Sequence, residues 1–137
     1  MDNSNDDIPW CSKLEKIPAY REYSFDLTIK SFDRSGAGFY FGIFKEENND
    51  YTDILNSSSL LYNPLGVLWD SKDERKIKET SDVGDELTLW IDIYTESIAW
   101  FRNKELIEVL ALPKQFLVGT LRTIIYLCGE ADAVSVK

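Results

Sequence analysis

Two stretches of this chain place apolar side chains at every second position, and this spacing constrains the fold more than any other feature. The residues from Tyr23 to Lys30 alternate apolar with polar, and those from Leu87 to Ile93 do so again. Successive side chains of an extended strand point to opposite faces, so the spacing predicts strands with one face on a core and the other in solvent. We therefore expect an all-β fold.

The second stretch continues into a predicted β-hairpin. The turn at Tyr94–Glu96 is followed by a returning strand over Ser97–Arg102, and both the length and the alternation are typical of a hairpin. Upstream, Ala37–Phe44 is apolar on both faces, which predicts a central strand covered on both sides. Gly38 and Gly42 within it allow neighbouring backbone or rings to approach closely.

Shorter apolar segments predict the rest of the strands. These segments are Glu105–Leu110, Leu121–Cys128 and Ala133–Val136. Seven or more short strands separated by polar turns predict a two-layer antiparallel β-sandwich, like a concanavalin-type jelly roll. We expect at most one or two short helical turns, at Ser12–Lys16 and at Pro113–Val118.

Several segments lack a regular pattern. Ile8–Glu22 contains two prolines and predicts an irregular arm, while Lys45–Ser59 and Asp70–Asp82 are polar or charged and predict loops. Pro64 is expected to confine the apolar stretch Leu60–Trp69 to a sheet edge or an irregular position, because proline cannot donate a ladder hydrogen bond. We expect residues 1–8 to form a disordered acidic tail and residues 9–137 a single domain.

Charge and length exclude some functions. The 137 residues carry a net charge of -9, which argues against reading a nucleic-acid backbone or docking on an anionic membrane. No apolar run approaches the roughly 20 residues of a membrane span, and Met1–Asp7 lacks the apolar core of a signal peptide. Cys11 and Cys128 are expected to be reduced thiols, with a disulfide between them as the alternative. These features favour a cytoplasmic or other reducing intracellular setting.

The residues needed for common catalytic and metal sites are missing. The chain has no histidine, and two cysteines do not suffice for a closed zinc site. An acid pair drawn from Asp82, Asp85 and Asp92, or from Asp50 and Asp53, is one alternative, and a calcium site near Asp50 is another. We favour solvated loops and turn caps for these carboxylates, and we predict no catalytic residue, metal or cofactor.

Aromatic residues are numerous, with four Trp, seven Tyr and seven Phe. Trp90 falls on the polar phase of its strand, whereas Trp100 shares the phase of Ile98, so one of the two tryptophans should face away from the inner side of the hairpin. Four further aromatics lie in or beside loops, where such residues often serve as binding hot spots but also anchor loops by packing. These are Tyr51, Tyr62, Trp69 and Tyr94.

The order of several short motifs resembles that of SPRY (B30.2-like) domains. The segment Val83–Asp92 reads as the family's valine-glycine-aspartate followed by an alternating strand, and Ser97–Asn103 is similar to its next strand. The other matching pieces are Tyr23–Asp26, Phe41–Ile43, Leu112-Pro113 and Thr123–Val136. Gly84 suits a turn with positive φ, and Asp85 and Asp92 suit the capping of backbone donors.

Two departures from the family pattern stand out. The glycine that usually follows the asparagine is Lys104 here, which predicts a looser or differently shaped turn. The Gly-Trp signature has only an approximate counterpart in Gly66–Trp69.

The resemblance implies a non-enzymatic protein-interaction module, an adaptor or a small subunit of a larger assembly, that binds a partner through loops at one edge of the sandwich. Carried over to this chain, the candidate partner-binding residues are Arg34, Ser35, Gly36, Tyr51, Trp69, Gly129 and Glu130. Arg34 would bond a ligand carbonyl or carboxylate, Tyr51 would supply apolar area, and Gly36 and Gly129 would allow close approach. The alternative is a glycan-binding sandwich, because SPRY domains resemble lectin-like jelly rolls.

Overall fold

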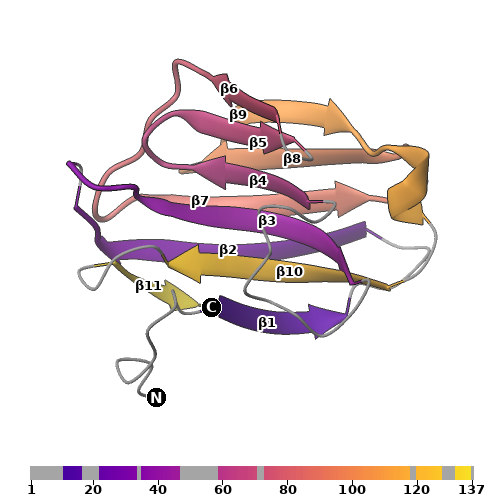
Figure 1. The fold of residues 1–137 in the computed structure, drawn as a ribbon, viewed down its shortest axis with the longest axis horizontal. Helices are drawn as coiled ribbons and strands as arrows, with labels where there is room; N and C mark the ends of the chain where they lie inside the picture. The colour runs from indigo at the N-terminus through magenta and orange to yellow at the C-terminus, as the bar shows by residue number, and fades with distance from the viewer. Residues whose placement is uncertain are drawn as a thin grey trace.

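The computed structural model describes residues 11–16, 22–33, 35–46, 59–70, 73–117, 120–127 and 132–136. Within them, eleven strands form two packed antiparallel sheets, as the period of two predicts (Figure 1). The six-stranded sheet has the order β1 (Cys11–Lys16), β10 (Thr120–Leu127), β3 (Phe39–Glu46), β4 (Ser59–Asn63), β5 (Val67–Asp70) and β6 (Asp73–Lys76). The five-stranded sheet has the order β11 (Ala133–Val136), β2 (Glu22–Ser31), β7 (Glu86–Asp92), β8 (Ser97–Arg102) and β9 (Glu105–Ala111).

The hydrophobic core fills the space between the two sheets. Inner strands contribute alternate residues to it, for example Leu27 and Ile29 of β2 and Leu89 and Ile91 of β7, none of which is exposed. Trp100 of β8 crosses the core, and its indole N–H donates to the carbonyl of Phe41 in β3 at 2.9 Å. Trp100 therefore links the two sheets by a buried hydrogen bond as well as by its packing.

Two predictions about local structure are wrong, and a third is right only in part. Ser12–Lys16 is not a helical turn but part of edge strand β1, because pairing with β10 supplies its backbone hydrogen bonds. Asp70–Asp82 is not loop throughout, since β6 pairs with β5 although all four of its residues are exposed. For Leu60–Trp69 the expected sheet edge is wrong, since β4 and β5 are inner strands, but Pro64 does interrupt the stretch with an irregular turn, the other position expected for it.

The predicted hairpin of β7 and β8 is confirmed, and so are its turn residues. Gly84 has φ 94° before β7. Asp92 accepts hydrogen bonds from the backbone of Tyr94 at 2.9 Å and of Thr95 at 3.3 Å. The predicted helical turn near Pro113 is the 3-10 helix Lys114–Leu117.

The turn between β8 and β9 stays tight despite the lysine. Only Asn103 and Lys104 separate the two strands, with φ values of 50° and 71°, so the expected looser turn is wrong. Two successive left-handed residues are typical of a type I′ hairpin turn. The Asn103 side chain secures the turn, since it accepts from Glu86 N at 2.9 Å and donates to Asp85 at 3.0 Å.

Within the part of the chain that the structure describes, no helix has the length and apolar character needed to cross a membrane.

Candidate binding site at one end of the sandwich

The turn between β2 and β3 forms the tip of one end of the sandwich. The Asp33 carboxylate accepts from the Ser35 hydroxyl at 2.6 Å and from the Ser35 backbone N–H at 2.9 Å, and Gly36 N–H donates to the Asp33 carbonyl at 3.0 Å. These bonds lower the pKa of Asp33 below its ordinary 3.8, mainly through the Ser35 hydroxyl. The tip therefore presents an ordered carboxylate and an open glycine backbone.

A buried asparagine ties this tip to the turn between β4 and β5. Asn63 is 1% exposed, donates to the carbonyl of Ala37 at 2.8 Å and accepts from Leu65 N–H at 3.0 Å. Gly38, with φ 75°, lies against it so closely that a Cβ would collide with the Asn63 side chain. Because the asparagine both donates and accepts a hydrogen bond and is closely packed, the two turns are held together.

Two further segments complete this end. The chain between β6 and β7 crosses the β4–β5 turn, where Ile77 N–H donates to the Gly66 carbonyl at 2.9 Å and Ser81 N–H to the Pro64 carbonyl at 2.8 Å. Leu127, the last residue of β10, pairs with Phe39, the first residue of β3. The end of β10 therefore lies beside the β2–β3 turn (Figure 1).

Beside this end, three aromatic rings gather on the outer face of the six-stranded sheet. The ring centroid of Tyr40 lies 6.4 Å from that of Trp69 and 6.3 Å from that of Tyr126. They pack against Phe44, Leu61 and Ile124, which are at most 2% exposed. Tyr40 lies two residues after Gly38, so the aromatic cluster adjoins the tip.

Comparison with known proteins identifies the fold. No protein-family model and no curated protein sequence matches the chain. Among solved structures, the SPRY domain of human HERC1 aligns with a TM-score of 0.65 at 17% identity, covering 93% of this chain and 77% of that one. The chain has the SPRY-domain fold. Two further solved structures support the same fold. The TRIM65 PSpry domain aligns with a TM-score of 0.69 at 9% identity, covering 95% of this chain and 72% of that one. A human SPRY domain aligns with a TM-score of 0.68 at 14% identity, covering 92% of this chain and 82% of that one.

The structure describes three of the seven predicted site residues of this SPRY fold. Ser35 and Gly36 lie in the β2–β3 turn, and Trp69 lies on β5 in the aromatic cluster. They thus occupy neighbouring surfaces, the tip and the outer face, which Tyr40 connects. The other four predicted residues lie outside the described residues: Arg34, Tyr51, Gly129 and Glu130.

One predicted loop aromatic is in fact a core residue. Tyr62 is on β4 with no exposed surface, and its hydroxyl lies 2.8 Å from that of Ser81 and donates to the Glu79 carbonyl at 3.0 Å. Burial raises the pKa of Tyr62 to about 12. Tyr62 therefore fastens the β6–β7 segment to the core and offers nothing to a ligand.

Sequence reasoning missed four residues that build the site: Asp33, Tyr40, Asn63 and Tyr126. The two tyrosines follow from a pattern that was visible, because predicted strands that are apolar on both faces must carry an outer cluster as well as an inner core. Asn63 had no such signal, since only the approach of two distant turns shows what its amide bonds.

Two of the carboxylates that were weighed as acid pairs, Asp85 and Asp92, act as turn caps, whereas Asp50 and Asp53 lie outside the described residues. Asp85 accepts from Asp82 N–H at 2.8 Å, as predicted for a cap. Asp85 and Asp92 lie at opposite ends of β7, so at ~3.3 Å per residue they are roughly 20 Å apart, beyond the ~5–10 Å that glycosidases use. Among the described residues, no group of three or more Cys, Asp and Glu side chains is placed to hold a metal ion.

Proposed function

We propose that this chain is a non-enzymatic protein-interaction module that binds a partner peptide or partner surface at the end bearing the β2–β3 turn. The observation that carries the proposal is the anchoring of this turn through buried Asn63 to a second turn, beside an aromatic cluster. Loops fixed on a rigid scaffold bind with little loss of conformational entropy. The SPRY fold supports the same conclusion, since it belongs to a family of interaction modules.

The chemistry of the tip suits a peptide ligand. The β2–β3 turn offers the Asp33 carboxylate and the backbone of Gly36, which together can bond the amides of an extended segment. Arg34 would bond a carbonyl or carboxylate of the partner, and Tyr51 and Trp69 would supply apolar area. Gly129 and Glu130, which follow β10, would border the same end. In this role the chain acts as an adaptor or as a small subunit of a larger intracellular assembly.

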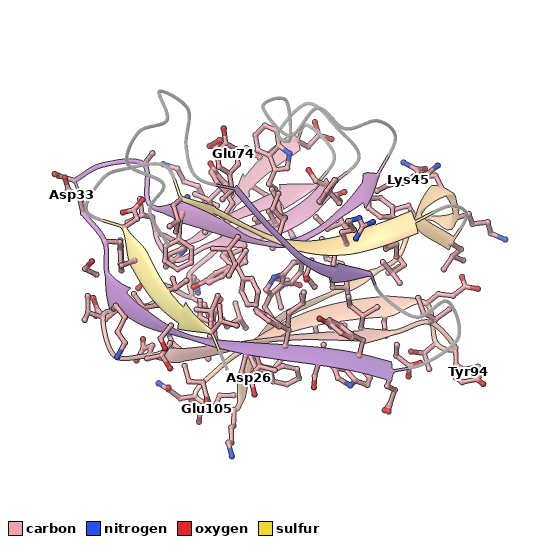
Figure 2. All side chains as sticks on the ribbon, turned by 90° about the horizontal axis from the view of Figure 1, so that it is seen from below. Asp26, Asp33, Lys45, Glu74, Tyr94 and Glu105 are labelled. Carbon is pink, nitrogen blue, oxygen red and sulfur yellow. The ribbon has the colours of Figure 1, made fainter. Side chains whose placement is uncertain are left out.

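The test is affinity capture from native extract followed by mass spectrometry. Arg34→Glu and Tyr51→Ala are compared with the unaltered chain and with Tyr94→Ala as the control. Tyr94 is 78% exposed and lies at the end of the sandwich away from Asp33 (Figure 2).

We expect both site variants, and not the control, to lose the same partner. Equal capture by all four proteins would show that the proposed end is not the binding surface. Binding to a glycan array without any captured protein would instead favour the lectin-like alternative.

A further inference from the structure

The outer face of the five-stranded sheet carries an apolar surface that the proposed function does not use. Trp90 of β7 pairs with Ala99 of β8, which pairs with Val109 of β9. One row along the sheet, Phe101 of β8 pairs with Leu106 of β9. On β7 and β8 the patch residues alternate with core residues. A register shift between β8 and β9 lets Leu106 and Val109, three residues apart, both pair with outward residues of β8, so all five side chains lie together on the outer face. We call them the β7–β9 patch.

Much of the β7–β9 patch is open to solvent. Leu106 is 54% exposed and Val109 is 48% exposed, whereas Ala99 between the larger side chains is 2% exposed. The outer apolar residues of the six-stranded sheet differ, since Phe44, Leu61 and Ile124 are at most 2% exposed. Contiguous exposed apolar side chains of this kind often mark an interaction surface.

Acidic residues flank the patch toward β2. On the same face, β2 places Asp26 beside Thr88, whose hydroxyl donates to the Asp26 carboxylate at 2.7 Å. Glu22 pairs with Asp92 further along β2 and β7. Figure 2 shows Asp26 on the outer side of this sheet. The face is therefore apolar over β8 and β9 and acidic toward β2.

The dimensions of the patch match one helix. Three strands at ~4.8 Å spacing span about 10 Å, which is close to the ~10–12 Å diameter of an α-helix. On β8 the two rows of the patch are two residues apart, about 6.7 Å, and residues four apart on a helix rise by about 6 Å. A helix lying along β8 would place an apolar stripe on both rows.

We propose that the β7–β9 patch is a second docking surface, occupied by an amphipathic helix of a partner protein whose apolar stripe is flanked on one side by Lys and Arg. The basic flank would face Glu22, Asp26 and Asp92. Charge also argues against a second copy of this chain as the occupant, since each copy carries a net charge of -9 and presents the same acidic flank.

The test uses a labelled synthetic helix of about 18 residues with leucines along one stripe and lysines along one flank. A matched peptide carries glutamates in place of the lysines. Affinity is measured by fluorescence anisotropy with the full chain, with Leu106→Ser/Val109→Ser, and with Val136→Ser as the control. Val136 is 45% exposed and lies in β11, at the opposite edge of the sheet.

We expect the lysine peptide to bind the unaltered chain and the control equally, and to bind the double variant at least about tenfold more weakly. The glutamate peptide should bind at least about tenfold more weakly than the lysine peptide. In nitrogen-15 spectra of the unaltered chain, the Trp90 indole signal, assigned with Trp90→Phe, should shift during the titration while that of core Trp100 does not.

Four results of the peptide titration would overturn the inference. They are no binding at about 1 mM peptide, equal binding by the double variant, equal binding of the glutamate peptide, and an unshifted Trp90 signal. Sedimentation that shows a dimer of the unaltered chain, dissociated by the double variant, would also overturn it. Tyr51→Ala, a variant of the proposed loop site, should leave binding of the lysine peptide unchanged. The peptide titration therefore tests the β7–β9 patch independently of the loop site.

Discussion

At the residue scale, several side chains work against local preference or leave a bond unmade. Lys104 adopts φ 71°, a left-handed conformation that disfavours residues with a Cβ. Thr123 on β10 is fully buried, and its hydroxyl has no hydrogen-bond partner within the described part of the chain. The Asp33 carboxylate accepts a hydrogen bond from the Ser35 hydroxyl. Each of these features leads to a measurable effect on stability or titration.

Replacing Lys104 by glycine should stabilise the domain. Glycine relieves the left-handed strain of about 1–2 kcal/mol, partly offset by its larger backbone entropy, so we expect a net gain of about 0.5–1 kcal/mol in the free energy of unfolding. Urea unfolding of the variant and the unaltered chain measures this difference in the free energy of unfolding. Asn103→Gly is the matched control and should instead lose stability, because the Asn103 side chain bonds Glu86 and Asp85.

Replacing Thr123 by valine should also stabilise the domain. The change removes a buried hydroxyl while keeping the side-chain shape, and an unsatisfied buried polar group costs about 1–3 kcal/mol. We expect a gain of about 1 kcal/mol in thermal or urea unfolding. Unchanged or lower stability would show that the hydroxyl is satisfied in solution. Thr123→Ala serves as a comparison, because it removes a methyl group as well as the hydroxyl. The difference between the two variants gives the contribution of side-chain packing.

The Asp33 carboxyl should titrate below 3.8, because the Ser35 hydroxyl and N–H bond its charged form and lower its pKa. A folded-state pKa below the unfolded one means that this contribution to stability is present above pH 3.8 and is lost as the pH falls through the folded value. The titration can be followed by the carbon-13 chemical shift of the Asp33 carboxyl. In Ser35→Ala the titration midpoint should lie closer to 3.8 than in the unaltered chain. An identical midpoint in both proteins would contradict the bond.

At the element scale, close approach between β3 and β4 limits what the six-stranded sheet tolerates. A Cβ on Gly42 would fall well inside the van der Waals distance of the Leu60 carbonyl on β4. The same sheet continues to β6, where Arg75 lies 3.8 Å from Glu108 of β9 in the other sheet. This pair is partly exposed, so it contributes little compared with the packing of the inner strands.

Gly42→Ala should therefore destabilise the domain by about 1–3 kcal/mol, the usual effect of overpacking, or prevent folding. Gly36→Ala is the matched control. An added Cβ there meets nothing nearer than 3.4 Å, and the backbone is not left-handed. We expect the control to melt close to the unaltered chain. Equal melting temperatures for Gly42→Ala and the unaltered chain would show that β3 and β4 are less closely packed than described.

The strands differ in how far the amino-acid sequence alone reveals them. Strands with a buried side, such as β2, β7 and β10, were predictable because packing imposes an alternating pattern on them. Edge strands β1 and β6 were missed, since β6 buries none of its residues and pairing alone makes it a strand. In the candidate site, the turn at Ser35 and Gly36 was predictable from its residue types, but the role of Asn63 depends on contacts between distant segments.

At the scale of the whole molecule, the two layers give the domain two chemically different surfaces. The end with the β2–β3 turn is built from polar turns fixed by Asn63, and the β7–β9 patch is apolar with an acidic flank. The bond from Trp100 to Phe41 joins the sheets that carry them. A module with two such surfaces would hold two partners at once, which suits an adaptor in a larger assembly.

The most direct test of the binding end is site-specific photo-crosslinking in native extract. A photoreactive residue replaces Ser35 in one protein and Tyr94 in another. Ser35 is bonded to Asp33, which lies at the opposite end of the sandwich from Tyr94 (Figure 2). We predict a discrete crosslinked partner from position 35 that is absent from position 94. Crosslinking only from position 94, or the same products from both positions, would contradict the account.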